Sequence, residues 1–164
     1  MIQLTELVIE AESWNSALPD LEVIAEEAAL LTLDVVDISA ANHEICILAC
    51  DDARIAALNA DFRGKPQPTN VLSWPAHDLA VATPGGIPVA PPPGPLGDIA
   101  LALETVTREA QSANRPLKSH ATHLILHGVL HLLGYDHQND EDARLMEGIE
   151  TRALNLLEIP DPYA

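Results

Sequence analysis

Apolar and polar positions change their spacing several times along the chain, and each change predicts an element of secondary structure. Residues 2–9 alternate loosely between apolar and polar, and residues 43–50 form a short apolar run, as strands do. Residues 71–74, which Pro75 closes, and residues 97–103 are two further short strand candidates. The pattern therefore predicts a sheet of about four strands.

Helical spacing occurs in the segments between and after these strands. From Asp20, apolar residues recur every three or four positions and predict a helix of about three turns. Asp51 is a suitable N-cap for a second helix. Further helices are expected over about 104–112, from Pro116 to about Leu133, and after a cap at Asn139. The expected buried stripes are Ile55, Leu58 and Phe62 in the second helix and Met146, Ile149, Ala153 and Leu157 in the last.

Strands and helices mix without strict alternation, which favours an α+β class with a mixed sheet of about four strands covered by about five helices. The length suits one domain over residues 1–164. Residues 76–96 are rich in proline and glycine, so we expect an exposed loop without a packed core. The uncharged run over 79–97 is long enough for a membrane span, but its six prolines exclude a membrane helix.

Composition narrows the possible partners and the compartment. The formal net charge of −17 disfavours broad binding to nucleic acid, so any polyanion must bind at a local patch. Cys46 and Cys50 lie in one predicted strand, roughly 13 Å apart, and cannot form a disulfide with each other. Two buried thiols and the lack of a visible secretory signal predict a reducing, cytoplasmic location.

Candidate chemistry is concentrated in residues 127–137. His127 and His131 are one helical turn apart, so both rings leave one face of a helix. Gly134 can end that helix in a left-handed conformation and let the chain turn back to deliver His137. Three imidazoles leave a tetrahedral zinc ion one open position, which is typical of catalytic zinc sites. The sequence predicts one Zn²⁺ per chain, although nickel, copper or iron accept the same ligands.

The segment differs at one position from the zinc peptidase pattern His-Glu-x-x-His-x-x-Gly-x-x-His, because residue 128 is glycine. Such a peptidase uses the glutamate as its general base, so Gly128 argues against peptide hydrolysis by that mechanism. A peptidase or another metallohydrolase stays open as an alternative if Asp98 or Asp136 replaces that carboxylate.

The metal segment, the Pro68–Pro75 stretch and the Leu96–Ile99 stretch together resemble the YbeY family of bacterial ribosomal RNA maturation factors, which are zinc-dependent endoribonucleases. The resemblance covers roughly residues 44–160. Members usually carry aspartate at position 70 and phenylalanine at position 74, where this chain has Asn70 and Trp74, and the proline-rich insert is longer here.

The resemblance implies the roles of particular residues. His127, His131 and His137 would bind zinc, and Arg63 matches the family's functionally important arginine. A guanidinium near the metal would stabilise charge on a phosphodiester during cleavage. Candidates for supporting the ligands or facing the substrate are His120, His123, Asp136, Ser73 and Asn70. Core packing or exposure to solvent is an equal alternative for His120 and His123, and Asp136 could instead cap the turn after Gly134. His123 cannot share an ion with His131, because the two lie about 12 Å apart along a helix.

The function that the resemblance implies is single-strand-specific endoribonuclease activity in ribosomal RNA processing, including maturation of the 16S rRNA 3′ end, and in ribosome quality control. Its implied partners are ribosomal RNA and the small ribosomal subunit with its associated proteins. No association with a membrane is expected. A ribosome assembly factor without catalytic activity, whose metal only holds the fold, is a further alternative.

Overall fold

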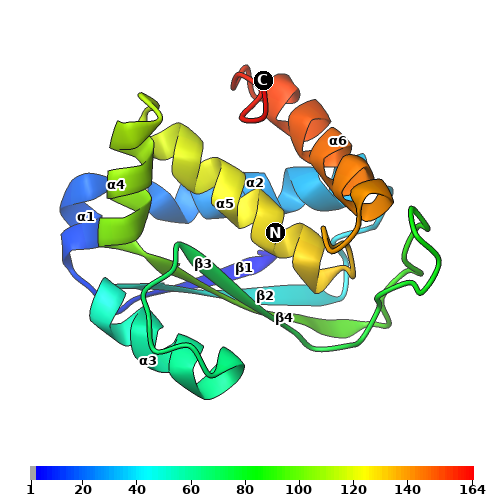
Figure 1. The fold of residues 1–164 in the computed structure, drawn as a ribbon, viewed down its shortest axis with the longest axis horizontal. Coiled ribbons are helices and arrows are strands. Elements are labelled where there is room, and N and C mark those ends of the chain that lie inside the picture. Colours follow the sequence, from blue (N-terminus) through cyan, green and yellow to red (C-terminus); the bar gives the residue numbers. More distant parts are fainter. Residues whose placement is uncertain (1–2) are drawn as a thin grey trace.

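A computed structural model describes residues 3–164 as a four-stranded sheet with helices on both faces (Figure 1). The strands are β1 (Thr5–Ile9), β2 (His43–Cys50), β3 (Val71–Pro75) and β4 (Gly94–Ala102), in the order β1-β2-β4-β3. β1, β2 and β4 are parallel, whereas β3 runs antiparallel to β4 at one edge. The mixed four-stranded sheet is the one that the sequence predicts, and residue 2 of the expected first strand lies outside the described residues.

The helices are α1 (Ser13–Ala17), α2 (Leu21–Val35), α3 (Asp52–Arg63), α4 (Leu103–Ser112), α5 (Leu117–Leu132) and α6 (Asp140–Leu156). In Figure 1, α3 lies on one side of the sheet, and α2, α4, α5 and α6 lie on the other. The five predicted helices are confirmed. The sequence did not predict α1, a single short turn that buries Trp14 completely.

Capping residues begin α3 and α6 as predicted. The side chain of Asp51 accepts a hydrogen bond from the backbone N–H of Arg54, and that of Asn139 accepts one from Asp142. Pro116, expected in the first turn of α5, is its N-cap residue instead. These local contacts depend only on residues three positions apart, which is why the sequence predicts them well.

The main core lies between the sheet and the layer containing α2 and α5. Helix α5 buries the apolar surface expected of it, namely Leu124, Ile125, Val129, Leu132 and Leu133. A smaller cluster lies under α3 on the opposite face and contains Cys50, Ile55, Leu72, Ala100 and Ala102. Helix α5 is therefore held firmly against the sheet along its length.

Three expectations about burial need correction. Phe62 is 49% exposed and does not belong to the buried stripe of α3, since it packs beside Trp74 at the edge strand. Leu157 caps α6 and is only half-buried. Both cysteines are free thiols, but only Cys50 is buried, while Cys46 is half-buried.

The proline-rich loop is largely exposed, as predicted, but it is shorter than predicted. Residues 94–96 belong to β4, and the side chain of Leu96 is buried. Pro95 is tolerated because it lies at the start of the strand, next to an irregularity in the pairing with β2. Leu79 is also buried, so the segment is anchored to the body of the protein near its beginning.

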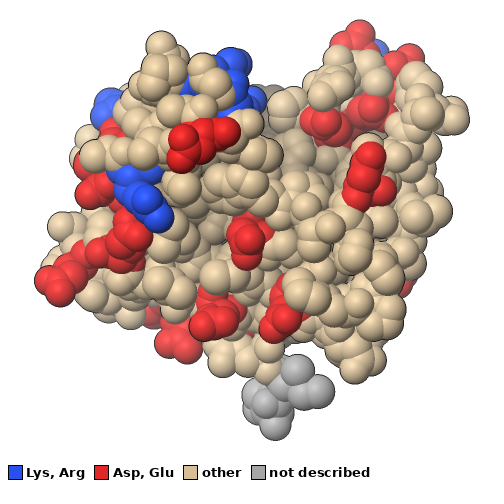
Figure 2. Space-filling view, turned by 90° about the horizontal axis from the view of Figure 1, so that it is seen from below, with Lys and Arg blue, Asp and Glu red and all other residues tan. Residues whose placement is uncertain are grey.

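Acidic residues outnumber basic ones, 25 to 8. On the face seen in Figure 2 the acidic side chains are spread widely, whereas the visible Lys and Arg gather toward the left of the view, where α1, α3 and α4 lie in Figure 1. No helix within residues 3–164 is long and apolar enough to cross a membrane.

Candidate metal centre

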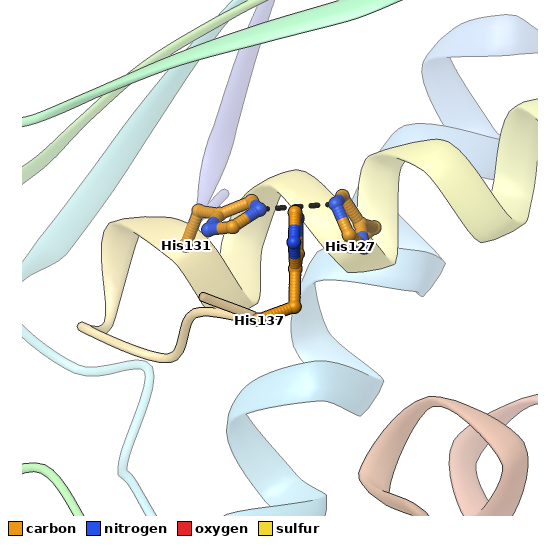
Figure 3. Close-up of side chains that lie close together, drawn as sticks. All are labelled: His127, His131 and His137. Carbon is orange, nitrogen blue, oxygen red and sulfur yellow. Dashed lines mark hydrogen bonds between the residues drawn. The ribbon is translucent and has the colours of Figure 1, made fainter. Parts of the chain in front are cut away.

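Three histidines converge beside the C-terminal end of α5. His127 and His131 project from the helix, and His137 rises from the following loop toward the space between them (Figure 3). One ring nitrogen of each residue lies within 4.8 Å of those of the other two. The structure therefore brings together the three residues that the sequence predicts as ligands.

Hydrogen bonds hold the two α5 rings through their Nδ1 atoms. His127 Nδ1 lies 2.7 Å from Glu150 Oε1, and His131 Nδ1 lies 2.9 Å from the backbone oxygen of Tyr135. Carboxylate and carbonyl oxygens only accept, so each Nδ1 carries the hydrogen, and in the neutral rings each Nε2 presents a lone pair. The two Nε2 atoms are 3.0 Å apart, and their lone pairs would repel each other unless a cation or a shared proton lies between them. This donor set fits a metal ion.

His131 is held in its neutral form. Burial, with smaller contributions from the neighbouring His127 and His137, lowers the pKa of His131 to about 4, although Asp136 acts in the opposite direction. A neutral imidazole is the form that binds a metal. At neutral pH this ring therefore does not have to lose a proton before it can act as a ligand.

The turn after α5 delivers His137 as the sequence predicts. Gly134 has a φ of +99°, a conformation that favours glycine. The backbone of Leu79 packs against it so closely that a Cβ atom at Gly134 would lie 2.6 Å from the Leu79 oxygen. The start of the proline-rich loop thus helps to fix the position of His137.

Gly128 faces the sheet, and its backbone is packed against neighbouring side chains. A Cβ atom at this position would lie 3.1 Å from Ile99 Cδ1 and 3.2 Å from Ser73 Oγ. Any residue with a Cβ atom would press on these two side chains, which would have to shift by a few tenths of an ångström. Glycine therefore has a packing role here, in addition to lacking the general base of a zinc peptidase.

A cleft of about 820 Å³ opens beside the histidines and extends along the edge strand β3. Its lining includes His127, His131 and His137, and also Phe62 and Arg63 from the C-terminal end of α3. Arg63 is exposed and makes no ion pair within residues 3–164. The fold thus places a free guanidinium and three imidazoles on the walls of one cleft.

Ser73 and Asn70 also line the cleft, but both have structural contacts. Ser73 Oγ lies 3.4 Å from the backbone oxygen of Gly128, which links β3 to α5. The amide of Asn70 donates to Glu109, which in turn lies 2.9 Å from the His120 ring. A neutral amide suits this position, because an aspartate there would face the carboxylate of Glu109.

Within residues 3–164, neither Asp136 nor Asp98 makes a side-chain hydrogen bond to a ligand imidazole. Asp136 lines the cleft, and its carboxylate accepts a hydrogen bond from the backbone N–H of His137, so it stabilises the turn. Asp98 is exposed and pairs in register with Cys46. It alternates with Ile99, which packs against α5, so it lies on the opposite face of the sheet. The idea that Asp98 replaces the missing base is wrong.

Glu150 and Tyr163 complete the surroundings of the site, and the sequence did not point to either. Glu150, on α6, is fully buried and bonds both His127 and His123, with a distance of 3.1 Å to His123 Nε2. The hydroxyl of Tyr163 donates to its other oxygen at 2.7 Å. The sequence did contain one indication of a role for Glu150. It lies between Ile149 and Ala153 on the apolar stripe of α6, and a carboxylate is buried there only if hydrogen-bond donors surround it.

Comparison with known proteins identifies the same family that the sequence motifs resemble. The family model described as Endoribonuclease YbeY matches residues 8–158. Endoribonuclease YbeY of Ruegeria pomeroyi is 56% identical over 163 residues, with 96% of each chain covered. The protein of the same name from Dinoroseobacter shibae is 53% identical, covering 96% of this chain and 89% of its own. A solution structure from Thermotoga maritima has a TM-score of 0.54 at 19% identity, over 94% of this chain and 92% of its own, which supports the fold.

Proposed function

This chain belongs to the endoribonuclease YbeY family, and from that premise we propose that it is a metal-dependent endoribonuclease that cleaves single-stranded regions of ribosomal RNA. The observation that carries the proposal is the meeting of three imidazoles and Arg63 in one open cleft. The processing step is maturation of the 16S rRNA 3′ end, and the same activity would serve ribosome quality control.

Zinc is the proposed metal, with His127, His131 and His137 as its ligands. The support is the donor set, because three neutral imidazoles suit zinc and leave a position free for chemistry. When bound, the ion supplies a Lewis acid that stabilises negative charge on a phosphoryl oxygen and activates water near neutral pH. Glu150 and the Tyr135 carbonyl direct two of the ligand nitrogens toward it.

Arg63 is the proposed phosphate-binding residue. Cleavage of a phosphodiester adds negative charge to the non-bridging oxygens, and a guanidinium can donate two parallel hydrogen bonds to them. Arg63 is free of ion pairs within residues 3–164 and lies on the cleft wall, so its donors are available to a substrate. It would hold the scissile phosphate in the cleft that the three histidines also line.

Aromatic side chains next to Arg63 support a preference for single strands. The rings of Phe62 and Trp74 lie 5.3 Å apart at the edge strand, and Phe62 is half exposed. Unpaired bases stack on such surfaces, whereas bases inside a duplex cannot reach them. The predominantly acidic surface would oppose long RNA contacts, so we infer that the ribosomal small subunit and its proteins help to present the substrate.

The test compares two arginines of the same helix in cleavage of an unstructured RNA. Arg63→Gln should reduce the rate roughly 100-fold, as loss of a charge-stabilising donor does in other enzymes. Arg54→Gln is the matched control, because it removes the same charge from α3 at an ion pair with Glu10 outside the cleft, and it should retain activity. His131→Ala should abolish metal-dependent cleavage.

The same assay separates the alternatives. Full RNA cleavage by both Arg63→Gln and His131→Ala would contradict the proposal. A peptidase would cleave a mixed peptide library in a metal-dependent way and leave RNA intact. An assembly factor without catalytic activity would keep binding the small subunit after metal removal and would cleave nothing. The absence of a carboxylate at Gly128 already weighs against the peptidase.

A further inference from the structure

The C-terminal tail reaches back to the histidine site through a buried carboxylate. Tyr163 follows a turn after α6, in which Asp161 accepts hydrogen bonds from the Tyr163 backbone and, at 3.2 Å, from Thr151. Its hydroxyl donates to Glu150 Oε2 at 2.7 Å, and Glu150 Oε1 accepts from His127 Nδ1, also at 2.7 Å. A chain of two hydrogen bonds thus joins the second-last residue to a proposed metal ligand.

Glu150 has an environment that is unusual for a structural glutamate. Its exposed fraction is 0%, and a buried carboxylate is strongly destabilising unless donors surround it. His127 and His123 donate to one oxygen and Tyr163 to the other, so both oxygens are partnered. These three donors supply the hydrogen bonds that a carboxylate needs when no water reaches it.

His123 acts here as a donor to Glu150 and not as a ligand of the proposed site. Its Nδ1 atom is buried and has no partner within residues 3–164, so a neutral ring with hydrogen on Nε2 is the form that avoids an unpaired N–H. The Tyr163 ring meets the His123 ring edge to face, with centroids 5.7 Å apart. Tyr163 therefore both bonds the carboxylate and packs against its other donor.

We propose that Glu150 and Tyr163 are positioning residues that set the metal affinity of the site through His127. The carboxylate keeps the hydrogen on His127 Nδ1, fixes the ring orientation and makes Nε2 a stronger donor to a cation. Tyr163 restricts the carboxylate to the rotamer in which it can do so. The inference rests on the proposed metal site, and it adds the C-terminal tail to that site as a determinant of metal retention.

The test measures Zn²⁺ affinity by competition with a chromophoric chelator. Replacing a carboxylate that orients a metal-bound histidine typically weakens binding 10- to 100-fold, so Glu150→Gln should weaken Zn²⁺ binding roughly that much. Tyr163→Phe keeps the ring and removes one hydrogen bond, and it should weaken binding by a smaller factor, on the order of 3- to 10-fold. Because Tyr163 is 45% exposed on the tail, this variant should fold even where Glu150→Gln does not.

Glu147→Gln is the matched control. It removes the same charge from α6 about one turn from Glu150, and Glu147 makes no hydrogen bond to a histidine within residues 3–164, so its Zn²⁺ affinity should match that of the unmodified protein. The spectrum of bound Co²⁺ gives a second measurement, and it should change in Tyr163→Phe but not in Glu147→Gln. A merely structural role would instead lower the melting temperature of the metal-free protein and leave both metal measurements unchanged.

Zn²⁺ affinities of Glu150→Gln and Tyr163→Phe within twofold of the unmodified protein, or an equal loss in Glu147→Gln, would overturn the inference. A different result would contradict the proposed function, namely tight Zn²⁺ binding by the unmodified protein without RNA cleavage. The two results are separable because metal affinity is measured without substrate.

Discussion

Replacing Gly134 with alanine should damage both the fold and the metal site. Gly134 joins α5 to the loop that carries His137, and its φ of +99° is unfavourable for any residue with a Cβ atom. A Cβ atom there would also lie 2.6 Å from the oxygen and 2.7 Å from the carbonyl carbon of Leu79. Both contacts are with backbone, so a side-chain rotation cannot relieve them, and the turn or the loop must move.

The expected loss of stability follows from these two effects. A left-handed backbone costs a residue with a Cβ atom about 1–2 kcal/mol. Forcing an extra methyl group into a packed contact costs a further 1–3 kcal/mol or so. Alanine favours helices more than glycine does, but this preference does not offset the loss, because α5 ends at Leu132 and residue 134 lies outside the helix. The free energy of unfolding should therefore fall by about 2–5 kcal/mol, which lowers the melting temperature by roughly 5–20 °C in a chain of this size.

The measurement is urea unfolding of the metal-free protein, followed by tryptophan fluorescence, together with Zn²⁺ competition. Gly148→Ala is the matched control, since Gly148 lies inside α6 and no atom of residues 3–164 lies within 4 Å of where its Cβ would be. That change should stabilise the protein by about 0.5–1 kcal/mol. The reasoning is refuted if Gly134→Ala unfolds at the same urea concentration as the unmodified protein, or binds Zn²⁺ equally well.

Three further outcomes are expected. Burial raises the pKa of Glu26, but hydrogen bonds from the Thr5 hydroxyl and the Leu4 and Thr5 amides outweigh it and lower the pKa below the usual 4.5. Glu26→Gln should therefore cost roughly 1–2 kcal/mol at pH 7, and this difference should shrink as the pH falls through 4.5 and below; a constant difference in urea unfolding from pH 7 to pH 3 would contradict it. Trp14→Phe removes a buried hydrogen bond of 2.8 Å to the Cys50 carbonyl and leaves a cavity, so the free energy of unfolding should fall by about 2–3 kcal/mol, and an unchanged thermal midpoint would refute this. Chelation with EDTA should lower the melting temperature of the zinc-loaded protein, because a metal that binds only the folded state stabilises that state. The Gly148→Ala protein should show the same decrease. An unchanged melting temperature in both proteins would count against a metal site.

Short-range features of this protein were predictable from the sequence because they depend on residues a few positions apart. The pair His127 and His131 shares a helix face through helical periodicity alone, and Gly134 marks the turn through its backbone freedom. The N-caps Asp51 and Asn139 are also short-range features, because each accepts a hydrogen bond from a backbone N–H three positions later. The candidate ligand set lies within eleven positions of the chain, so no long-range contact was needed to suggest it.

The tertiary structure decided which distant residues surround that set. The face on which Asp98 lies depends on the register of β4 against β2, and the sequence contains no signal for it. Phe62 looks like a core residue by its spacing, but the narrow sheet ends at β3 and leaves it at the rim of the cleft. Glu150 and Tyr163 reach His127 only because α6 packs across α5 and the tail folds back. Periodicity shows which side of an element is apolar, whereas the partner on that side is set by packing between segments far apart in the chain.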